Sequence, residues 1–388
     1  MGLGPLLASR EIVVTCGAGG VGKTTTAAAL GAIAATRLGG RVLVLTVDPA
    51  RRLADALGLT GPGGTGLGNT ERRIDPSLFQ AAGTEPRGEL WAAMLDTKQS
   101  WDELITRHAP DPSVRAAILA NPLYDNITGK FVQSHDYIAM ERLHELHASG
   151  DWDLIVVDTP PSRHALDFLD APARMTEFFG SRLLRWLTVP YRSKLFAAAS
   201  RPFYDVADRI LGSSFLHDIA EFFLLFQTME RGFVARAAEV TRVLSDRRTS
   251  FVVVSTLETG PLGEARYFLD ALDRRRLALG GVVLNQALPA VLRDPSARAA
   301  ADRLRADPDA VARRLAGIGD LSPPSESVAL ARVLSEIAES FVNLALVATR
   351  EAELATELRI DAPTVLVPSM PSDVADLTGL LAVGDRLW

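Results

Sequence analysis

Glu11-Ile-Val-Val-Thr-Cys-Gly-Ala-Gly-Gly-Val-Gly-Lys-Thr-Thr-Thr26 joins a short apolar run, a glycine-rich loop and the start of a helix-forming segment. Inside it, Gly17-x-x-x-x-Gly22-Lys23-Thr24 is the P-loop pattern. We predict a buried strand from Ile12 to Val14 and a helix from Thr25 to Arg37. In that arrangement the N–H groups of the loop and the N-terminus of the helix converge on phosphate oxygens. A glycine-rich turn that binds nothing is a poor alternative, because the loop and both flanking elements agree.

Each residue type in this loop has a chemical reason to be there. Glycines let the main chain wrap an anion without a steric conflict from a Cβ atom. The ammonium group of Lys23 can reach the β- and γ-phosphates of a nucleotide, and the hydroxyl of Thr24 can bind Mg²⁺. The predicted nucleotide site therefore consists of Gly17, Gly19, Gly20, Val21, Gly22, Lys23, Thr24 and Thr25.

The composition indicates a folded protein and excludes several classes. Of 388 residues, 47% are apolar and 23% are charged, which suits one large domain with insertions, or two domains. A net charge of −6 gives no support for a nucleic-acid surface. The single cysteine, Cys16, excludes a disulfide framework and a Cys-x-x-Cys metal clip within one chain. With no signal peptide and no apolar run of spanning length, we expect a cytoplasmic protein with at most peripheral membrane association.

Six apolar runs of strand length predict the fold. They are continuous rather than alternating, as in strands buried on both faces, and helical stretches separate them. The predicted fold class is therefore α/β: a P-loop NTPase with a mostly parallel sheet flanked by helices. The six predicted strands are Ile12–Thr15, Val42–Thr46, Leu154–Val157, Phe251–Ser255, Val282–Leu284 and Thr364–Val367.

Two intervals between these strands are too long for simple crossovers and are largely helical in pattern. We interpret them as one inserted helical subdomain, residues 76–149 plus 171–248. The nucleotide-binding core would then be residues 1–75, 150–170 and 249–388. The helices predicted in the insertion are Glu89–His108, Val114–Ala120, Ser134–His147, Ala173–Leu187, Tyr204–Leu211 and Leu216–Ser245.

Two aspartates follow predicted strands. Asp158 ends the run Leu154–Val157, a Walker B arrangement in which the carboxylate holds Mg²⁺ through a water molecule. Asp48 follows the second strand in Thr46-Val-Asp-Pro-Ala50. A carboxylate there could orient or deprotonate an attacking water molecule, whereas an Asx turn before proline explains the spacing equally well.

Four motifs, in this order, resemble those of the ArsA-type ATPases. That family includes the arsenite-efflux ATPases and the eukaryotic factor that delivers tail-anchored membrane proteins. The resemblance covers essentially the whole chain, and it implies a Mg²⁺-dependent ATPase that works as a two-fold dimer with ATP between the halves. The motifs are Gly17-Ala-Gly-Gly-Val-Gly-Lys-Thr-Thr25, Val47-Asp-Pro-Ala50, Asp158-Thr-Pro-Pro-Ser-Arg-His-Ala-Leu-Asp-Phe-Leu169 and Val283-Leu-Asn-Gln286.

The resemblance also implies roles for single residues. It implies that Asp48 lies in switch I and positions the attacking water. The segment from Asp158 to Leu169 matches switch II, which links the γ-phosphate to the helical subdomain. Asn285 matches the asparagine that contacts adenine, although from the residues alone it could also be a strand-end turn residue. Pro368 lies in the segment Val367–Pro371, which matches the loop that closes over the base.

One departure from the family pattern concerns the subunits. The family loop usually reads Gly-Lys-Gly-Gly-x-Gly-Lys-Thr, and its first lysine reaches the partner's phosphates, but this chain has Ala18 there. A cation delivered by another subunit is worth on the order of 10³–10⁵ in rate for arginine fingers. We therefore hypothesise a heterodimer with a related ArsA-like subunit that supplies the lysine; self-association is the alternative. Arg163, where relatives often have glycine, is another possible source of charge.

A second departure concerns ligands and clients. Cys16 alone can supply neither the several thiols of the efflux ATPases nor the cysteine pair that holds zinc in the tail-anchor factors, so metalloid transport is a poor assignment. The helix positions His144 and His147 could share a metal, but no further ligand is evident. The apolar stretches Ala173–Val189 and Leu216–Ala235 are either a helical core or a groove for a hydrophobic protein client.

Several functions remain open from the sequence. The first is a cytoplasmic ATPase that handles or targets a protein client. The second is a regulatory ATP-binding subunit with little hydrolysis of its own, which Ala18 favours. The third is the ATPase component of an anion efflux system, and a small-molecule P-loop kinase is a further alternative. An electron carrier like the nitrogenase reductase is excluded by the single cysteine.

Overall fold

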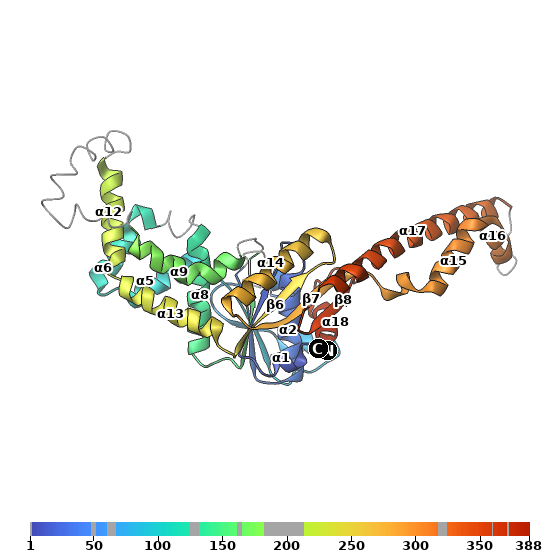
Figure 1. Ribbon diagram of the computed structural model, residues 1–388. Coiled ribbons are helices and arrows are strands. Elements are labelled where there is room, and N and C mark those ends of the chain that lie inside the picture. The colour runs from blue at the N-terminus through green and yellow to red at the C-terminus, as the bar shows by residue number, and fades with distance from the viewer. Residues whose placement is uncertain are drawn as a thin grey trace.

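The computed structural model describes most of the chain. The described residues are 2–47, 52–59, 67–124, 132–160, 165–181, 213–316, 324–358, 360–370 and 372–388. They form a central sheet with helices on both faces, and helical projections leave it on opposite sides (Figure 1). The fold therefore has the α/β architecture that the sequence predicts.

The sheet contains eight strands in the described part of the chain, in the order β3-β4-β2-β5-β1-β6-β7-β8. Neighbouring strands are parallel except for the antiparallel pair of β3 and β4. All six predicted strands are confirmed, and β1 lies between β5 and β6. The strands are β1 Ile12–Cys16, β2 Arg41–Thr46, β3 Arg72–Arg73, β4 Glu89–Met94, β5 Leu154–Asp158, β6 Thr249–Ser255, β7 Leu279–Ala287 and β8 Thr364–Pro368.

The central strands β1, β5 and β6 are buried at every position, which explains their continuous apolar sequences. Successive side chains of a strand point to opposite faces of the sheet. Val13 and Val156 accordingly pack on one face, and Ile12 and Ile155 pack on the other. The described side chains therefore form a separate hydrophobic core on each face.

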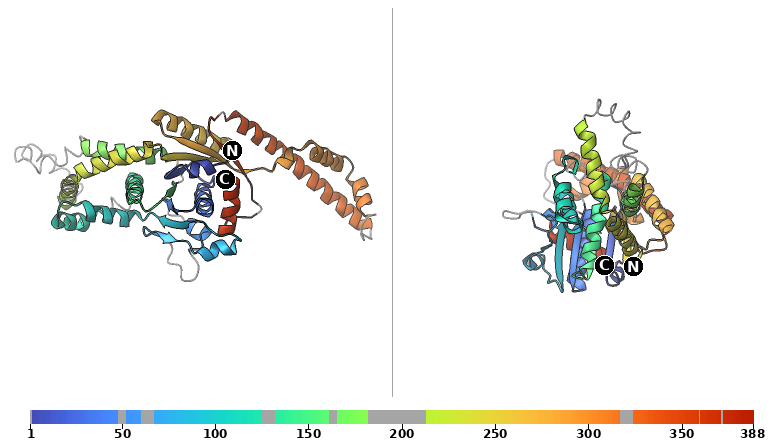
Figure 2. Two further views of the ribbon diagram at one scale, coloured as in Figure 1. Left: turned by 90° about the horizontal axis from the view of Figure 1, so that it is seen from below. Right: turned by 90° about the vertical axis from the view of Figure 1, so that its left-hand side faces the viewer.

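Helices cover both faces (Figure 2). The Val13 face carries α1 Gly4–Leu7, α2 Lys23–Arg37, α3 Arg52–Ala56, α4 Pro76–Ala81 and α18 Leu377–Leu387. The Ile12 face carries α5 Thr97–His108, α6 Pro112–Ala120, α8 Val132–Ala148, α9 Ala165–Gly180, α12 Ser213–Gln227, α13 Glu230–Ser245 and α14 Thr259–Arg275. Within the described ranges, we find no helix that combines the length and the apolarity needed to cross a membrane.

The prediction of one helix over Glu89–His108 is wrong at its start. Residues Glu89–Met94 form β4, which pairs with β2 over six residues, and α5 begins only at Thr97. The carboxylate of Asp96 caps that helix by accepting from the Gln99 N–H. Local helix propensity in β4 is overridden by strand pairing. This strand lies within residues 76–149, so that part of the predicted insertion belongs to the sheet, and the rest of the domain division stays a prediction.

The prediction of one helix over Leu216–Ser245 also needs correction. The chain forms two helices there, α12 and α13, which are separated by a turn at Thr228 and Met229. The helices predicted at Val114–Ala120 and Ser134–His147 are confirmed as α6 and α8. The helix predicted at Tyr204–Leu211 lies outside the described residues.

Apolar side chains of α9, α12 and α13 fill a core between the helices. Phe179, Phe222, Phe226 and Phe233 are buried, and the rings of Phe226 and Phe233 lie 5.0 Å apart. These contacts support the core interpretation for the described part of the two apolar stretches. The end of the first stretch, residues 182–189, lies outside the described part of the chain.

A helical arm that the sequence analysis does not predict connects β7 to β8. It projects away from the sheet on the side opposite α12 in Figure 1 and in the left-hand view of Figure 2. A small core that includes Ala301, Ala338 and Val342 holds two of its helices together. The arm consists of η1 Ala290–Arg293, α15 Pro295–Ala306, α16 Pro308–Ala316 and α17 Pro324–Glu357.

Candidate nucleotide site

The loop from Gly17 to Gly22 joins the carboxyl end of β1 to the start of α2. Gly20 and Gly22 have φ angles of 80° and 92°, in the left-handed region that favours glycine. Gly17 approaches β6 so closely that a Cβ atom would lie 2.0 Å from the carbonyl oxygen of Val254. The conformation of the loop therefore requires these glycines.

The first turn of α2 has no side-chain cap. Its N-cap residue is Gly22, no described side chain accepts a hydrogen bond there, and the turn contains no acidic residue. Helices α4, α5, α6, α15 and α18 instead begin with aspartates that accept from their first N–H groups. The amino end of α2, with its positive dipole and its N–H groups, is thus suited to an anion such as phosphate.

Lys23 is the first residue of α2, and its side chain lies inside the loop. Its Nζ donates to the carbonyl oxygen of Ala18 at 2.7 Å, and the residue is only 6% exposed. A P-loop lysine occupies this position, from which its ammonium group contacts the phosphates of a bound nucleotide. Ala18 occupies the position of the first lysine in the ArsA-type loop Gly-Lys-Gly-Gly-x-Gly-Lys-Thr, which this loop resembles.

Asp158 ends β5, next to the strand that carries the loop. It lies opposite Thr15 of β1 and Thr46 of β2. The residue is fully buried, and its Oδ2 accepts from the Thr46 hydroxyl at 2.9 Å. The Thr159 hydroxyl donates to the carbonyl oxygen of Thr15 at 2.8 Å and ties the two strand ends together. Asp158 thus presents a carboxylate at the carboxyl edge of the sheet, as a Walker B aspartate does.

A cavity of about 580 Å³ connects the loop with the carboxyl ends of β7 and β8. This volume is within the range of about 300–1,000 Å³ typical of small-molecule sites. The Nδ2 of Asn285 donates to the carbonyl oxygen of Val21 at 2.9 Å, so β7 is joined directly to the loop. The predicted site residues that line the cavity are Gly20, Gly22, Thr24, Thr25, Asn285 and Pro368.

Part of the cavity wall consists of residues to which the sequence analysis assigns no individual role. Gln286 lines it with a φ of 57°, a backbone conformation that non-glycine residues rarely adopt. Continuing the predicted Val367–Pro371 loop by a few residues would have found another part of the wall. Ser369 and Met370 of that predicted loop line the cavity, whereas the wall residues outside it include Leu53, Asp55 and Ala56 of α3, and Ser372, Asp373, Val374 and Ala375 after β8.

Two of the predicted functional residues, Asp48 and Arg163, lie outside the described residues. The strand that leads to Asp48 ends beside Asp158, since the Val47 N–H donates to the carbonyl oxygen of Asp158 at 3.0 Å. The roles of Asp48 and Arg163 stay predictions.

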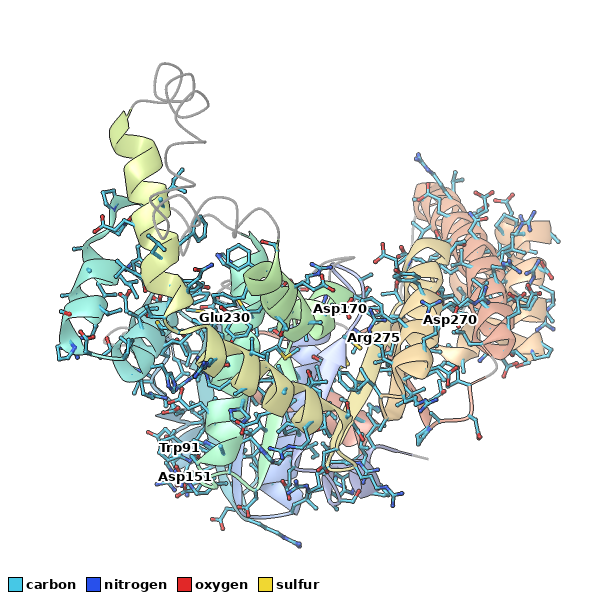
Figure 3. All side chains as sticks on the ribbon, turned by 60° about the vertical axis from the view of Figure 1, so that its left-hand side comes forward. Trp91, Asp151, Asp170, Glu230, Asp270 and Arg275 are labelled. Carbon is cyan, nitrogen blue, oxygen red and sulfur yellow. The ribbon has the colours of Figure 1, made fainter. Side chains whose placement is uncertain are left out.

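Helix α9 continues the segment that resembles switch II, and an ion pair holds it to α14. The two carboxylate oxygens of Asp170 accept from Nη2 and Nε of Arg275 at 2.7 and 3.1 Å (Figure 3). Hydrogen bonding to Asp170 raises the pKa of Arg275. A displacement of α9 would have to break or carry along this two-point contact.

The cysteine and the two histidines that could bind a soft metal ion are buried or lie beside carboxylates. Burial raises the pKa of Cys16 to about 12, so the thiol stays protonated at neutral pH and is a poor ligand. His144 and His147 lie 3.4 and 2.8 Å from Glu239 and Glu11, respectively. Among the residues that the structure describes, no group of three or more His, Cys, Asp or Glu side chains could hold a metal ion.

A second cavity, of about 620 Å³, lies between α5, α8 and α13. Its wall contains the ion pair of Arg236 and Glu141, and the Tyr137 hydroxyl donates to Glu141 at 3.0 Å. Burial raises the pKa of Glu141. Arg107 and Arg142 on the same wall are also paired with carboxylates. Because these arginines are already paired with carboxylates, this cavity is less suited to phosphate than the glycine loop is.

The parallel sheet, the glycine loop after β1 and the aspartate at the end of β5 define a P-loop nucleotide-binding protein. Comparison with known proteins places it more narrowly. The model of a family described as Anion-transporting ATPase, the ArsA ATPases, matches residues 10–307. The chain therefore belongs to the ArsA-type ATPase family.

Individual relatives include an uncharacterised protein and two ATPases. The chain is 31% identical over 285 residues to an uncharacterised protein of Streptomyces coelicolor, covering 72% of this chain and 63% of the relative. It is 26% identical over 284 residues to the ATPase get3 of Schizosaccharomyces pombe, covering 72% and 74%. It is 25% identical over 275 residues to the ATPase GET3 of Podospora anserina, covering 70% and 71%. The chain thus spans less than two thirds of the Streptomyces relative.

Gly22→Ala is expected to destabilise the protein more than Gly20→Ala. Both glycines have positive φ angles, but a Cβ atom at Gly22 would lie 2.2 Å from Nδ2 of Asn285, whereas at Gly20 it meets no described atom within 4 Å. Urea denaturation should show an additional loss of about 1–3 kcal/mol for Gly22→Ala. Adding Asn285→Ala removes the obstructing amide and should recover part of that loss. Equal losses for the two glycine variants would contradict the importance of this contact.

Proposed function

We propose that this chain binds and hydrolyses ATP in the cavity between the Gly17–Gly22 loop and the ends of β7 and β8. The observation that carries the proposal is that Gly22, Thr24 and Asn285 line one cavity while Lys23 is buried inside the adjoining loop. The loop, Lys23 and the amino end of α2 would bind the phosphates. Asn285 and Pro368 would contact the adenine.

Thr24 and Asp158 would hold Mg²⁺, which supplies positive charge to neutralise the phosphates. The donor set fits a hard cation, because it consists of a hydroxyl and a carboxylate. Thr24 lines the cavity, and Asp158 is a buried carboxylate on the strand beside β1. Asp48, two residues beyond Thr46, would position the attacking water.

The proposal includes a dimer whose shape changes with the nucleotide state. Ala18 carries no charge at the position where the family loop has a lysine for the neighbouring subunit. A symmetric pair of this chain would therefore lack that cation at both sites. We propose that a related ArsA-like subunit supplies it and completes this chain's site.

The dimer would handle or target a protein client in the cytoplasm. This part rests on the family resemblance, because the apolar core of α9, α12 and α13 is largely filled by its own side chains. The exposed Phe178, whose ring lies 5.8 Å from that of Phe223, is where a hydrophobic client would find apolar surface. A second candidate function is a regulatory subunit that binds ATP and hydrolyses little, and Ala18 is the observation that favours it.

The test is an ATPase assay of the purified chain with and without the subunit recovered with it from the native cell. We expect weak activity alone and at least about 10³-fold more in the mixture. Equal rates would exclude the requirement for the second subunit. Tight ATP binding without hydrolysis by this chain's site in the mixture would favour the regulatory subunit. Absence of ATP binding would overturn the whole proposal.

A further inference from the structure

The arm carries an apolar surface that no described part of the chain covers. Helix α17 has 34 residues and is about 50 Å long at 1.5 Å per residue. Its carboxyl end joins the main core at Leu354, and the rest projects from the sheet (Figures 1 and 2). The family match ends at residue 307, before α16 and α17. Family membership therefore does not explain this helix.

The two faces of α17 differ in the size and burial of their side chains. The face toward α15 and α16 has small buried residues seven positions apart, at Ala331, Ala338 and Ala345. Another face has large apolar residues that are about half exposed. We call these residues the arm seam: Val333, Ile337, Leu344 and Val347, with exposed fractions of 50%, 55%, 45% and 50%.

The spacing of the seam identifies the kind of surface that it fits. With Leu330 and Ser340 included, the positions follow one another in steps of three and four residues, which is the heptad repeat of a coiled coil. Leu292 and Phe341 border the seam and help to form a groove of about 460 Å³. Single exposed apolar residues are ordinary, but a row at this spacing, interrupted here only by Ser340, is typical of a helix that packs along another helix.

The charges beside the seam indicate which partner helix would pack against it. Glu336 and Arg350 stand seven residues before and after Asn343, and they lie beside Ile337 and one helical turn after Val347, respectively. Within α17 they pair with Arg332 and Glu353 on the exposed surface. If two copies of α17 run antiparallel about an axis near Asn343, Glu336 of each copy lies opposite Arg350 of the other. In a parallel in-register pair, Glu336 and Arg350 of different copies would lie 14 residues, about 21 Å, apart along the axis and could not meet. The seam is therefore complementary to a second copy of itself in the antiparallel arrangement. A two-fold pair of this kind stops at two copies and does not extend into a filament.

We propose that α17 pairs with α17 of a second copy of this chain, antiparallel and about a two-fold axis, so that the two seams cover each other. The groove along the seam shares no lining residue with the nucleotide cavity. The pairing is thus independent of the proposed function. It would join two copies of the chain whether or not each also binds a lysine-bearing subunit.

The first test measures the self-association of the full chain without nucleotide by analytical ultracentrifugation. The wild-type chain should form dimers, and Ile337→Lys or Leu344→Lys should weaken the dimer at least 100-fold. Because these side chains are about half exposed, circular dichroism and the melting temperature of the monomer should change little. Glu339→Lys is the matched control, since Glu339 is exposed on the same helix but lies off the seam. A chain that stays monomeric up to about 100 μM, or a dimer that is insensitive to both seam variants, overturns the proposal.

The second test determines the orientation of the pair. Glu336→Arg should weaken the dimer, and adding Arg350→Glu should restore it, because the exchanged charges again lie opposite each other. Asn343→Cys should be joined between copies by a short bis-maleimide, whereas Glu353→Cys should not. The natural Cys16 is buried and should not react. Failure of the charge exchange to restore the dimer, or equal cross-linking at both positions, contradicts the antiparallel pair.

A third test asks whether the seam binds a membrane instead. If the wild-type chain forms no dimers and binds anionic vesicles, and Ile337→Lys does not bind them, the seam is a membrane-binding surface and the proposal is overturned.

Discussion

Lys23→Met should reduce ATP turnover by at least about 10²–10³-fold, the loss typical of removing one group that stabilises charge in a transition state. Lys23 lies inside the P-loop, with its Nζ 2.7 Å from the carbonyl oxygen of Ala18 and 6% of the residue exposed. Methionine preserves the approximate length of the side chain and favours helix as well as lysine does, so the start of α2 should persist. The variant therefore removes the cation while leaving the loop folded.

The measurement is kcat and KM for ATP at saturating Mg²⁺, with the native partner subunit present. Lys98→Met is the matched control, because Lys98 is an exposed lysine near the start of α5 that pairs with Asp102. We expect the control to retain wild-type turnover. Nucleotide affinity, measured with a fluorescent ATP analogue, should fall only for Lys23→Met. Unchanged turnover of Lys23→Met would show that hydrolysis occurs elsewhere, at a site that does not use this loop.

Burial on both faces of the sheet explains which strands can be recognised from the sequence. The strands β1, β5 and β6 are covered on both faces, so their sequences are unbroken apolar runs. β4 is not recognisable in this way, since Glu-Leu-Trp-Ala-Ala-Met includes good helix formers. Its strand conformation depends on pairing with β2 and on tertiary contacts such as that of Trp91 with Trp152, whose rings are 5.6 Å apart. Such contacts are not encoded within the segment itself.

The same distinction applies to the candidate site. The phosphate-binding loop is contiguous, so its residue types and spacing reveal it directly. Asn285 and Pro368 come from strands far away in the sequence, and only the family resemblance indicates them. The cavity wall at Asp55 and Asp373 depends on where the fold places α3 and the segment after β8. The exposure of the arm seam likewise depends on which face of α17 packs on α15 and α16.

Ala18→Lys should raise the ATP turnover of the purified chain alone, by on the order of 10³–10⁵. In a pair of identical variant chains, each copy would supply the cation that the other lacks. Ala18 is buried and its carbonyl oxygen accepts from Lys23, so the new side chain must turn outward from the loop. The melting temperature should therefore be measured alongside the rate, to separate a loss of folded protein from a change in chemistry.

Ala18→Met is the control that separates charge from size, because methionine fills similar space without a cation. We expect its turnover to equal that of the wild-type chain. Adding the native lysine-bearing subunit should then stimulate the wild-type chain and Ala18→Met strongly, but Ala18→Lys only slightly. If a well-folded Ala18→Lys is no faster than Ala18→Met, the missing positive charge does not limit this site. The low ATP turnover of the purified chain would then have to be explained by its own switch residues and not by the absence of a lysine from a partner subunit.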